Sequence, residues 1–206
     1  MRRILLMLAV VVLLLPLPLQ AAAEGDLARA VRAELNAARA NPRNYAEYLR
    51  AYRAHISGRY YIPPGSRTRF VTKEGAAAVD EAIRHLLRQK PLRPLAWSDA
   101  LSRAAADLAV EQGKTGTTGH GEGKTGMKAR IERHGRWERT IGENISYGPN
   151  EARGVVMQLI IDDGVPNRGH RTNIFDPTYG TVGITCGPHP VFETLCAIDF
   201  AGGFSD

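Results

Sequence analysis

Two histidines in this chain lie beside glycines, where the backbone can approach a cleft closely and leave the imidazole accessible. His120 is flanked by Gly119 and Gly121, and His170 follows Gly169. Two neutral imidazoles about 4 Å apart can share a soft divalent ion such as Zn²⁺, and a carboxylate behind each ring fixes its tautomer and raises its basicity. A metal-binding cleft of this kind needs two acids beside the two histidines.

Glu143 is the first candidate acid. Residues 139–147 predict a strand in which Glu143 shares one face with apolar neighbours that should be buried. A buried carboxylate without a partner is strongly destabilising, so Glu143 must have one. It is therefore either part of a site or the partner of Arg139 or Arg130 in a salt bridge, and the sequence leaves both open.

The second acid is expected from the pair Asp162-Asp163, which ends the last long predicted helix just before Gly164. A helix C-terminus favours cations, so an aspartate there needs a compensating partner unless it is only solvated. We expect Asp163 to be the member that faces the cleft. By spacing alone these residues are a weak signal, because no local metal motif such as HExxH is present.

The same residues allow three functions. The first hypothesis is a non-catalytic binding module with a divalent metal in its cleft, and the alternative is a hydrolase in which Glu143 and Asp163 would be catalytic, acting with the histidines on water or a metal hydroxide. Ser146 is close in sequence, but strand alternation turns it away from Glu143, and it lacks the strained turn that exposes a nucleophilic serine. In a third reading the four groups only tie helix ends to the sheet.

The elements that must position these residues are indicated by apolar spacing. Helices alternate with irregular segments in most of the chain, and the strands come late, which predicts an α+β fold with a small antiparallel sheet covered by helices. We expect helices from Asp26 to Asn41, from Pro42 through Tyr52, and at 74–89, 100–111, 127–134 and 151–161, an exposed loop at 55–73, and strands at 139–147, 182–186 and 191–200.

The cysteines Cys186 and Cys196 are separated by a segment that reads as a turn. If the flanking strands form a hairpin, the two sulfurs face each other across neighbouring strands at a separation that a disulfide can bridge. In an exported chain we expect them to pair, and two free buried thiols are the alternative.

The N-terminus has the three zones of a signal peptide. Basic Arg2 and Arg3 precede an apolar run from Ile4 to Leu19, and small residues follow, with Ala21 and Ala23 as the expected cleavage pair. A retained membrane anchor is the alternative, but the run is shorter than the roughly 20 residues a span needs. We therefore expect export to the periplasm or the exterior, a single domain at residues 24–206, and no membrane span after cleavage of residues 1–23.

The remaining composition says little about partners. The formal net charge of +6 includes two arginines of the predicted signal peptide, and the other basic residues read as scattered. A mild positive field favours anionic surfaces such as wall polymers or lipid headgroups, whereas nucleic-acid binding would need basic residues clustered with aromatics. We expect no nucleic-acid partner.

Several motifs together resemble the CAP superfamily of cysteine-rich secretory proteins, insect venom antigens and pathogenesis-related plant proteins. The similarity follows the family's order from about Leu27 to Ala201. It is carried by Ala38-Arg39-Ala40-Asn41-Pro42, Leu95-Ala96-Trp97-Ser98, Gly142-Glu143-Asn144-Ile145, Gly169-His170-Arg171-Thr172-Asn173-Ile174-Phe175 and Tyr179-Gly180-Thr181-Val182-Gly183-Ile184.

The resemblance implies an α/β/α sandwich and a cleft tetrad, which falls here on His120, Glu143, an acid of the Asp162-Asp163 pair and His170. It also implies an exported protein that binds a divalent metal, and a lipid, sterol or cell-wall fragment in apolar grooves. The segment after His170 has the form typical of bacterial relatives, and the cysteine-rich tail of some animal members is absent. Ion-channel activity linked to that tail is therefore not expected.

Overall fold

The structure is a computed structural model that describes the backbone of residues 19–205 and the side chains of residues 26–205. Most of the predicted signal peptide, residues 1–23, lies outside the described residues. Its last five residues form the first turns of α1 (Leu19–Ala40), which therefore begins before the predicted cleavage site.

Six of the predicted elements are helices in the structure, with ends that follow from local chemistry. Pro42 occupies the first turn of α2, whose N-cap Asn41 accepts a hydrogen bond from the backbone N–H of Asn44. Ser98 caps α4 in the same way, but this helix passes the expected stop at Gly113 and ends at Gly116, which has the left-handed backbone of a helix C-terminus. The helices after α1 are α2 (Pro42–Arg53), α3 (Ala76–Arg88), α4 (Asp99–Thr115), α5 (Met127–His134), α6 (Ala152–Ile161) and the short α7 (Gly169–Ile174), and a 3-10 turn, η1, spans Gly123–Thr125.

The main sheet has the order β4-β6-β7-β5. Strands β5 (Arg136–Tyr147), β6 (Thr181–His189) and β7 (Glu193–Ser205) pair antiparallel, as predicted, and the two-residue β4 (Ala96–Trp97) adds a parallel pair to β6 that the sequence did not indicate. β5 forms one edge of this sheet. Its position leaves the candidate acid Glu143 on an edge strand.

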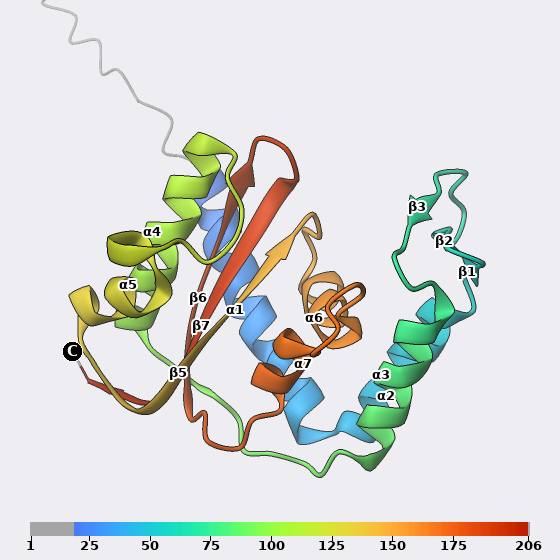
Figure 1. The fold of residues 1–206 in the computed structure, drawn as a ribbon, viewed down its shortest axis with the longest axis horizontal. Helices are drawn as coiled ribbons and strands as arrows, with labels where there is room; N and C mark the ends of the chain where they lie inside the picture. Colours follow the sequence, from blue (N-terminus) through green and yellow to red (C-terminus); the bar gives the residue numbers. More distant parts are fainter. Residues whose placement is uncertain (1–18, 206) are drawn as a thin grey trace, which may run out of the picture.

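Helices cover both faces of the sheet, which confirms the α+β sandwich (Figure 1). Phe200 and Ile198 face the larger core with α1, α2, α3 and α6, whereas Ala197 and Ala201 face α4 and α5. In β6, Gly183 lets α4 approach so closely that any side chain there would collide with the helix backbone. The two layers therefore bring loops from both sides to the edge strand β5.

Cys186 and Cys196 form a disulfide, as expected. They are direct partners in the antiparallel pairing of β6 and β7, with Cα atoms 4.0 Å apart. The bond ties together the hairpin whose turn lies at 190–192.

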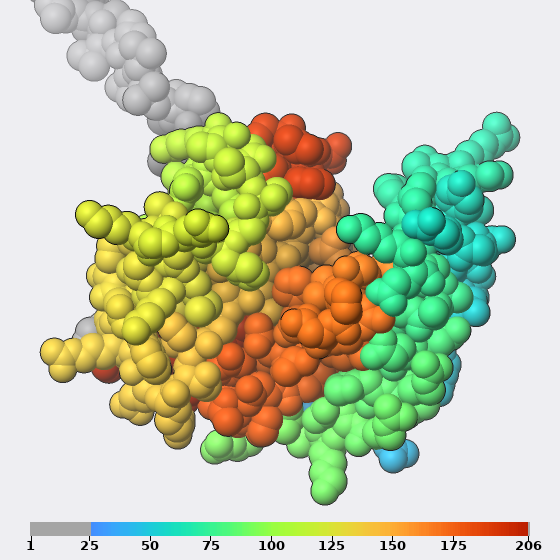
Figure 2. Space-filling model, in the orientation of Figure 1, coloured from blue at the N-terminus to red at the C-terminus, as the bar shows by residue number. Residues whose placement is uncertain are grey.

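The segment 55–73, expected to be a loop, contains a small antiparallel sheet. Its strands are β1 (Ile56–Ser57), β2 (Tyr60–Tyr61) and β3 (Phe70–Val71). Tyr61 stacks on Tyr52 of α2 at 4.1 Å between ring centroids. We call residues 55–73 the arm, because they project from the body beyond the ends of α2 and α3 (Figures 1 and 2).

No helix in the described part of the chain is long and apolar enough to cross a lipid bilayer.

Candidate functional site

His120 and Glu143 are brought together, as predicted. The Nδ1 atom of His120 lies 2.7 Å from Oε1 of Glu143. The imidazole is about half exposed (53 %), whereas the carboxylate is almost fully buried (1 %). Because Nδ1 is engaged by the acid, Nε2 is the ring nitrogen left to face an ion or a ligand.

Arg130 of α5 is the buried cation that balances Glu143. Its guanidinium pairs with Oε2 of Glu143, and both side chains are 1 % exposed. It also donates to the carbonyl of His120 at 2.9 Å, so it holds the loop as well as the acid. Glu143 therefore forms the salt bridge to Arg130 that the sequence allowed and contacts His120 as well, whereas Arg139 donates to the carbonyl of Gly202.

Asp199 is a buried acid in this cluster that the sequence analysis missed. It is the cross-strand partner of Glu143 in β7, fully buried, and neither of its oxygens has a hydrogen-bond partner among the described residues. Burial, and then the neighbouring charge of Glu143, raise the pKa of Asp199 well above its usual range. An aspartate between the apolar residues Ile198 and Phe200 was the available sequence signal.

The loop that carries His120 is fixed by two polar residues on neighbouring elements. Gln112 of α4 donates to the carbonyl of Gly119 at 2.6 Å, and the hydroxyl of Tyr147 accepts from the N–H of Gly119 at 2.9 Å. The Tyr147 hydroxyl also donates to the Gln112 amide oxygen at 2.8 Å. Both the backbone N–H and the carbonyl of Gly119, the residue before His120, are therefore hydrogen-bonded to these side chains.

His170 is paired with Asp162, and the expectation of Asp163 is wrong for this contact. The Nδ1 atom of His170 lies 2.6 Å from Oδ1 of Asp162, and Oδ2 accepts the backbone N–H of His170 at 2.9 Å. Asp163 instead accepts the N–H groups of Lys73 and Glu74, at 2.6 and 2.7 Å.

The physical reason for this choice is the end of α6. Asp162 is the C-cap residue and has left-handed backbone angles (φ 57°, ψ 43°), which turn its side chain back toward the start of α7. N–H groups at the start of α7 therefore stabilise the Asp162 carboxylate. They offset the unfavourable interaction of a negative charge with the C-terminus of α6.

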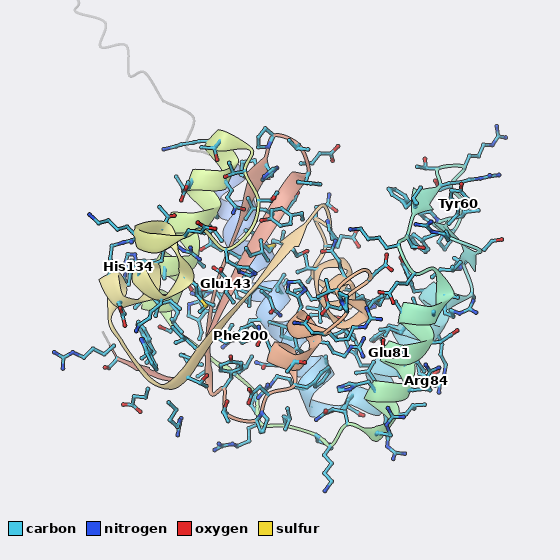
Figure 3. All side chains as sticks on the ribbon, viewed as in Figure 1. Tyr60, Glu81, Arg84, His134, Glu143 and Phe200 are labelled. Atoms are coloured by element: carbon cyan, nitrogen blue, oxygen red, sulfur yellow. A yellow bond between two sulfur atoms is a disulfide. The ribbon has the colours of Figure 1, made fainter. Side chains whose placement is uncertain are left out.

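The two histidine–carboxylate pairs meet at two consecutive residues of β5, Glu143 and Asn144. Glu143 turns to one face of the strand, toward α5 (Figure 3). Asn144 turns to the other face, where it donates to the carbonyl of His170 at 2.9 Å. Asn173 of α7 donates to the Glu143 carbonyl at 3.3 Å and to the Asn144 side chain at 2.9 Å. Helix α7 is thus docked on β5 at the position of the first pair.

Each of the two pairs leaves one imidazole nitrogen that could serve as a metal ligand. In both pairs a carboxylate holds Nδ1, which leaves Nε2 of His120 and of His170 without a protein partner among the described groups. No cluster of three or more His, Cys, Asp or Glu side chains in the described residues has the arrangement of a metal site. A closed site with four protein ligands, as structural zinc requires, is therefore not what these residues form.

A groove with a volume of about 1110 Å³ runs from the second pair to the arm. Asp162, Asp163 and His170 are among the residues that line it, and α6 contributes Met157, Gln158 and Leu159. Most of its other walls are apolar or aromatic, and they come from α2, the arm and the turn between β6 and β7: Tyr48, Tyr52, Tyr61, Phe70, Val71, Val191 and Phe192.

Two further polar residues near the site, Ser146 and His189, are buried. Ser146 is on the opposite face of β5 from Glu143, as predicted. It is buried, and its hydroxyl lies 2.5 Å from the amide oxygen of Gln158. His189 lies outside the predicted tetrad. His189 is buried and its ring contacts Tyr147 and Phe192.

The sequence profile described as "CAP: Cysteine-rich secretory protein family" matches residues 32–197. Three solved structures are similar: an outer surface protein from Borrelia burgdorferi (TM-score 0.46, 19 % identity, 53 % of this chain and 78 % of that one), an extracellular SCP-domain protein from Bacillus anthracis (0.44, 17 %, 61 % and 37 %) and a cysteine-rich secretory protein from Staphylococcus aureus (0.42, 16 %, 66 % and 42 %). The chain thus spans less than half the length of the last two.

No curated protein matches the chain. The family profile nevertheless covers most of it, including both histidine–carboxylate pairs and the disulfide. The chain belongs to the CAP family of cysteine-rich secretory proteins.

Proposed function

We propose that this CAP-domain protein is an exported, non-catalytic binding module. In this proposal His120 and His170 bind a divalent cation such as Zn²⁺, and the adjoining groove takes a lipid, a sterol or a cell-envelope fragment. The observation that carries the proposal is the pair of imidazoles, each with Nδ1 held by a buried carboxylate and Nε2 left free.

Three features support the metal part. Carboxylates behind metal-binding imidazoles raise their basicity and fix the tautomer that presents Nε2. Both carboxylates, Glu143 and Asp162, are almost fully buried, so their orientation is fixed before any ion arrives. The imidazoles themselves retain access to solvent, His120 more than His170.

The groove supports the second part of the proposal. Its apolar and aromatic walls suit an apolar ligand, and such sites usually have few polar groups at fixed positions. His170 and Asp162 supply polar groups to its lining. A ligand that fills the groove would therefore contact the second histidine pair.

Export is supported by two observations. The N-terminal residues have the signal-peptide pattern, and the structure contains a disulfide, which persists in oxidising compartments.

Zinc titration by calorimetry at neutral pH tests the metal part. We expect micromolar binding to the protein recovered after export, and loss of that binding in the double variant His120→Ala/His170→Ala. His134→Ala is the matched control, because His134 is also paired with an aspartate, Asp107, at 2.9 Å, but lies on α5 outside the two pairs.

Two results would contradict the metal site. One is the absence of zinc binding by the unmodified protein, and the other is equal binding by the double variant. Either result would shift the proposed function to the groove and the protein surface.

A hydrolase is the second candidate, favoured by the half-exposed imidazole of His120 with the buried carboxylate of Glu143 behind it. Such a pair can activate water. In this candidate the second acid is Asp162 rather than the expected Asp163, because Asp162 is the aspartate that contacts His170. In a peptidase assay with unfolded casein, Glu143→Gln is expected to abolish any turnover while circular dichroism stays unchanged; an unaltered rate would remove this candidate.

A further inference from the structure

The arm carries a concentration of positive charge that the sequence analysis did not separate from scattered basic residues. Residues 55–73 contain no aspartate or glutamate. Their four cations, Arg59, Arg67, Arg69 and Lys73, are all exposed, and none forms an ion pair within the described part of the chain. The arm therefore presents uncompensated positive charge.

Large apolar side chains stay exposed on the arm and on the β6–β7 turn. Phe70 and Val71 of β3 are 54 % and 71 % exposed, and Val191 and Phe192 in the β6–β7 turn are 68 % and 40 % exposed. Among the described residues, Val110 is the one large exposed apolar side chain that lies neither on the arm nor at the groove. A gathering of this kind marks a binding surface.

The two faces of the arm have different neighbours. Tyr61 and Phe70 are cross-strand partners, and Tyr61 stacks on α2, so this face forms the groove wall. Tyr60 and Val71 are the next cross-strand pair and therefore share the other face of the small sheet, and Val71 also borders the groove. The guanidinium of Arg69 lies 6.0 Å from the centre of the Tyr60 ring. Apolar and cationic groups thus stand side by side on the outer face.

The arm and the β6–β7 turn project toward the same side of the molecule, at the upper edge of Figures 1 and 2. The groove is lined by both, so it opens between them. A flat surface placed against this side would contact both projections and cover the mouth of the groove.

We propose that this side docks on an anionic lipid bilayer, with the arm as the main anchor and the β6–β7 turn as a second contact. Cations without acids bind lipid headgroups, and aromatic and aliphatic side chains enter the boundary between headgroups and acyl chains. A soluble polyanion would satisfy the arginines but would leave Val71 and Val191 in water, which favours the bilayer. The inference is independent of a metal at the histidine pairs.

Sedimentation with lipid vesicles tests the docking surface. Vesicles of phosphatidylcholine are compared with vesicles that contain about one third phosphatidylglycerol, and we expect binding only to the latter. Each cation near such a surface contributes about a 5-fold change in affinity, so Arg67→Glu/Arg69→Glu should weaken binding at least about 10-fold. Tyr60→Ser/Val71→Ser should also weaken it, because these side chains would no longer enter the bilayer.

The matched control is Arg84→Glu/Arg88→Glu, which makes the same change of net charge at exposed positions on α3, away from the arm (Figure 3). Its affinity should stay within about 2-fold of the parent. All variants are compared as exported protein with the same N-terminus, determined by mass spectrometry, so any contribution of the apolar run before residue 20 cancels.

Four outcomes would overturn the proposal. The first is the absence of binding to the anionic vesicles, and the second is equal weakening of binding by the control variant. The third is an unchanged affinity of Tyr60→Ser/Val71→Ser, which would show that no apolar side chain enters the bilayer. The fourth is arm-dependent binding of a single-stranded oligonucleotide without vesicle binding, which would make the arm a polyanion site.

Discussion

In both histidine–carboxylate pairs the acid contacts Nδ1 of the imidazole, but the groups that surround the two acids differ. Behind His120, the acid Glu143 lies in the interior with Arg130 and a second buried carboxyl. Behind His170, the acid Asp162 ends a helix and accepts backbone N–H groups of the next one. The first pair is held by balance of buried charges and the second by local backbone geometry, so the two should respond differently to the same kind of change.

The largest difference should appear when the buried cation is removed. Arg130→Met leaves two acids in the interior without a positive charge, and breaking a buried pair in this way destabilises by about 3–5 kcal/mol. The measurement is the free energy of unfolding in urea. Arg133→Met on the same helix removes a cation whose pair with Asp107 is partly exposed, and its effect should stay below about 1 kcal/mol. Equal effects of the two variants would show that buried charge balance does not hold the first pair.

Removing the acid of the second pair should have an intermediate effect. Asp162→Asn weakens the bonds to the ring and backbone of His170 and should lower the free energy of unfolding by about 1–3 kcal/mol. It should also change the tautomer of His170, read from its imidazole ¹⁵N chemical shifts. Asp163→Asn, which changes the contacts to the backbone of Lys73 and Glu74 just before α3, should leave those shifts unchanged. A shift change from Asp163→Asn alone would reverse the assignment.

The buried acid Asp199 should make the first pair sensitive to pH in a direction opposite to that of a surface carboxylate. Because burial raises its pKa in the folded state, the folded protein holds a proton that the unfolded chain releases from about pH 4 upward. This contribution to stability is present below that pH and is lost as pH rises toward the folded pKa. Asp199→Asn removes this loss and should therefore be more stable than the parent at pH 7.

Denaturant unfolding from pH 4 to pH 8 measures this effect. The stability advantage of Asp199→Asn over the parent should grow with pH. An advantage that does not change with pH would show that Asp199 is not protonated in the folded protein.

The smallest effect is expected at the surface network beside the second pair. Hydrogen bonds from Arg168 lower the pKa of Glu74 to about 2, so its contribution to stability is present above about pH 4.5 and is lost as pH falls toward 2. Glu74 is one third exposed, and Glu74→Gln should therefore lower stability by less than about 1 kcal/mol at pH 7. At pH 2 the two proteins should be about equally stable; a persistent difference there would point to packing rather than charge.

Much of the fold could be predicted because it depends on short-range patterns. Helical spacing located α2 and α3, and alternation placed Glu143 and Ser146 on opposite faces of β5. The disulfide followed from a hairpin between Cys186 and Cys196. The sheet at 55–73 was not predicted, because its two-residue strands are too short for a period to be recognised.

The site was predicted in part. His120 with Glu143, and His170 with an acid of the Asp162-Asp163 pair, came from the family resemblance together with the residue types. The choice between the two aspartates was wrong, because it depends on the backbone angles of one residue at the end of α6.

The sequence by itself determined the longer helices and strands and which side chains their buried faces carry, because these properties repeat over a few residues. Only the tertiary structure decided that Arg130 balances Glu143, that Asp199 lies beside them, and that the arm and the β6–β7 turn border one groove. These relations join residues far apart in the chain. They depend on how helices pack on the sheet and on strand register, which local periodicity does not specify.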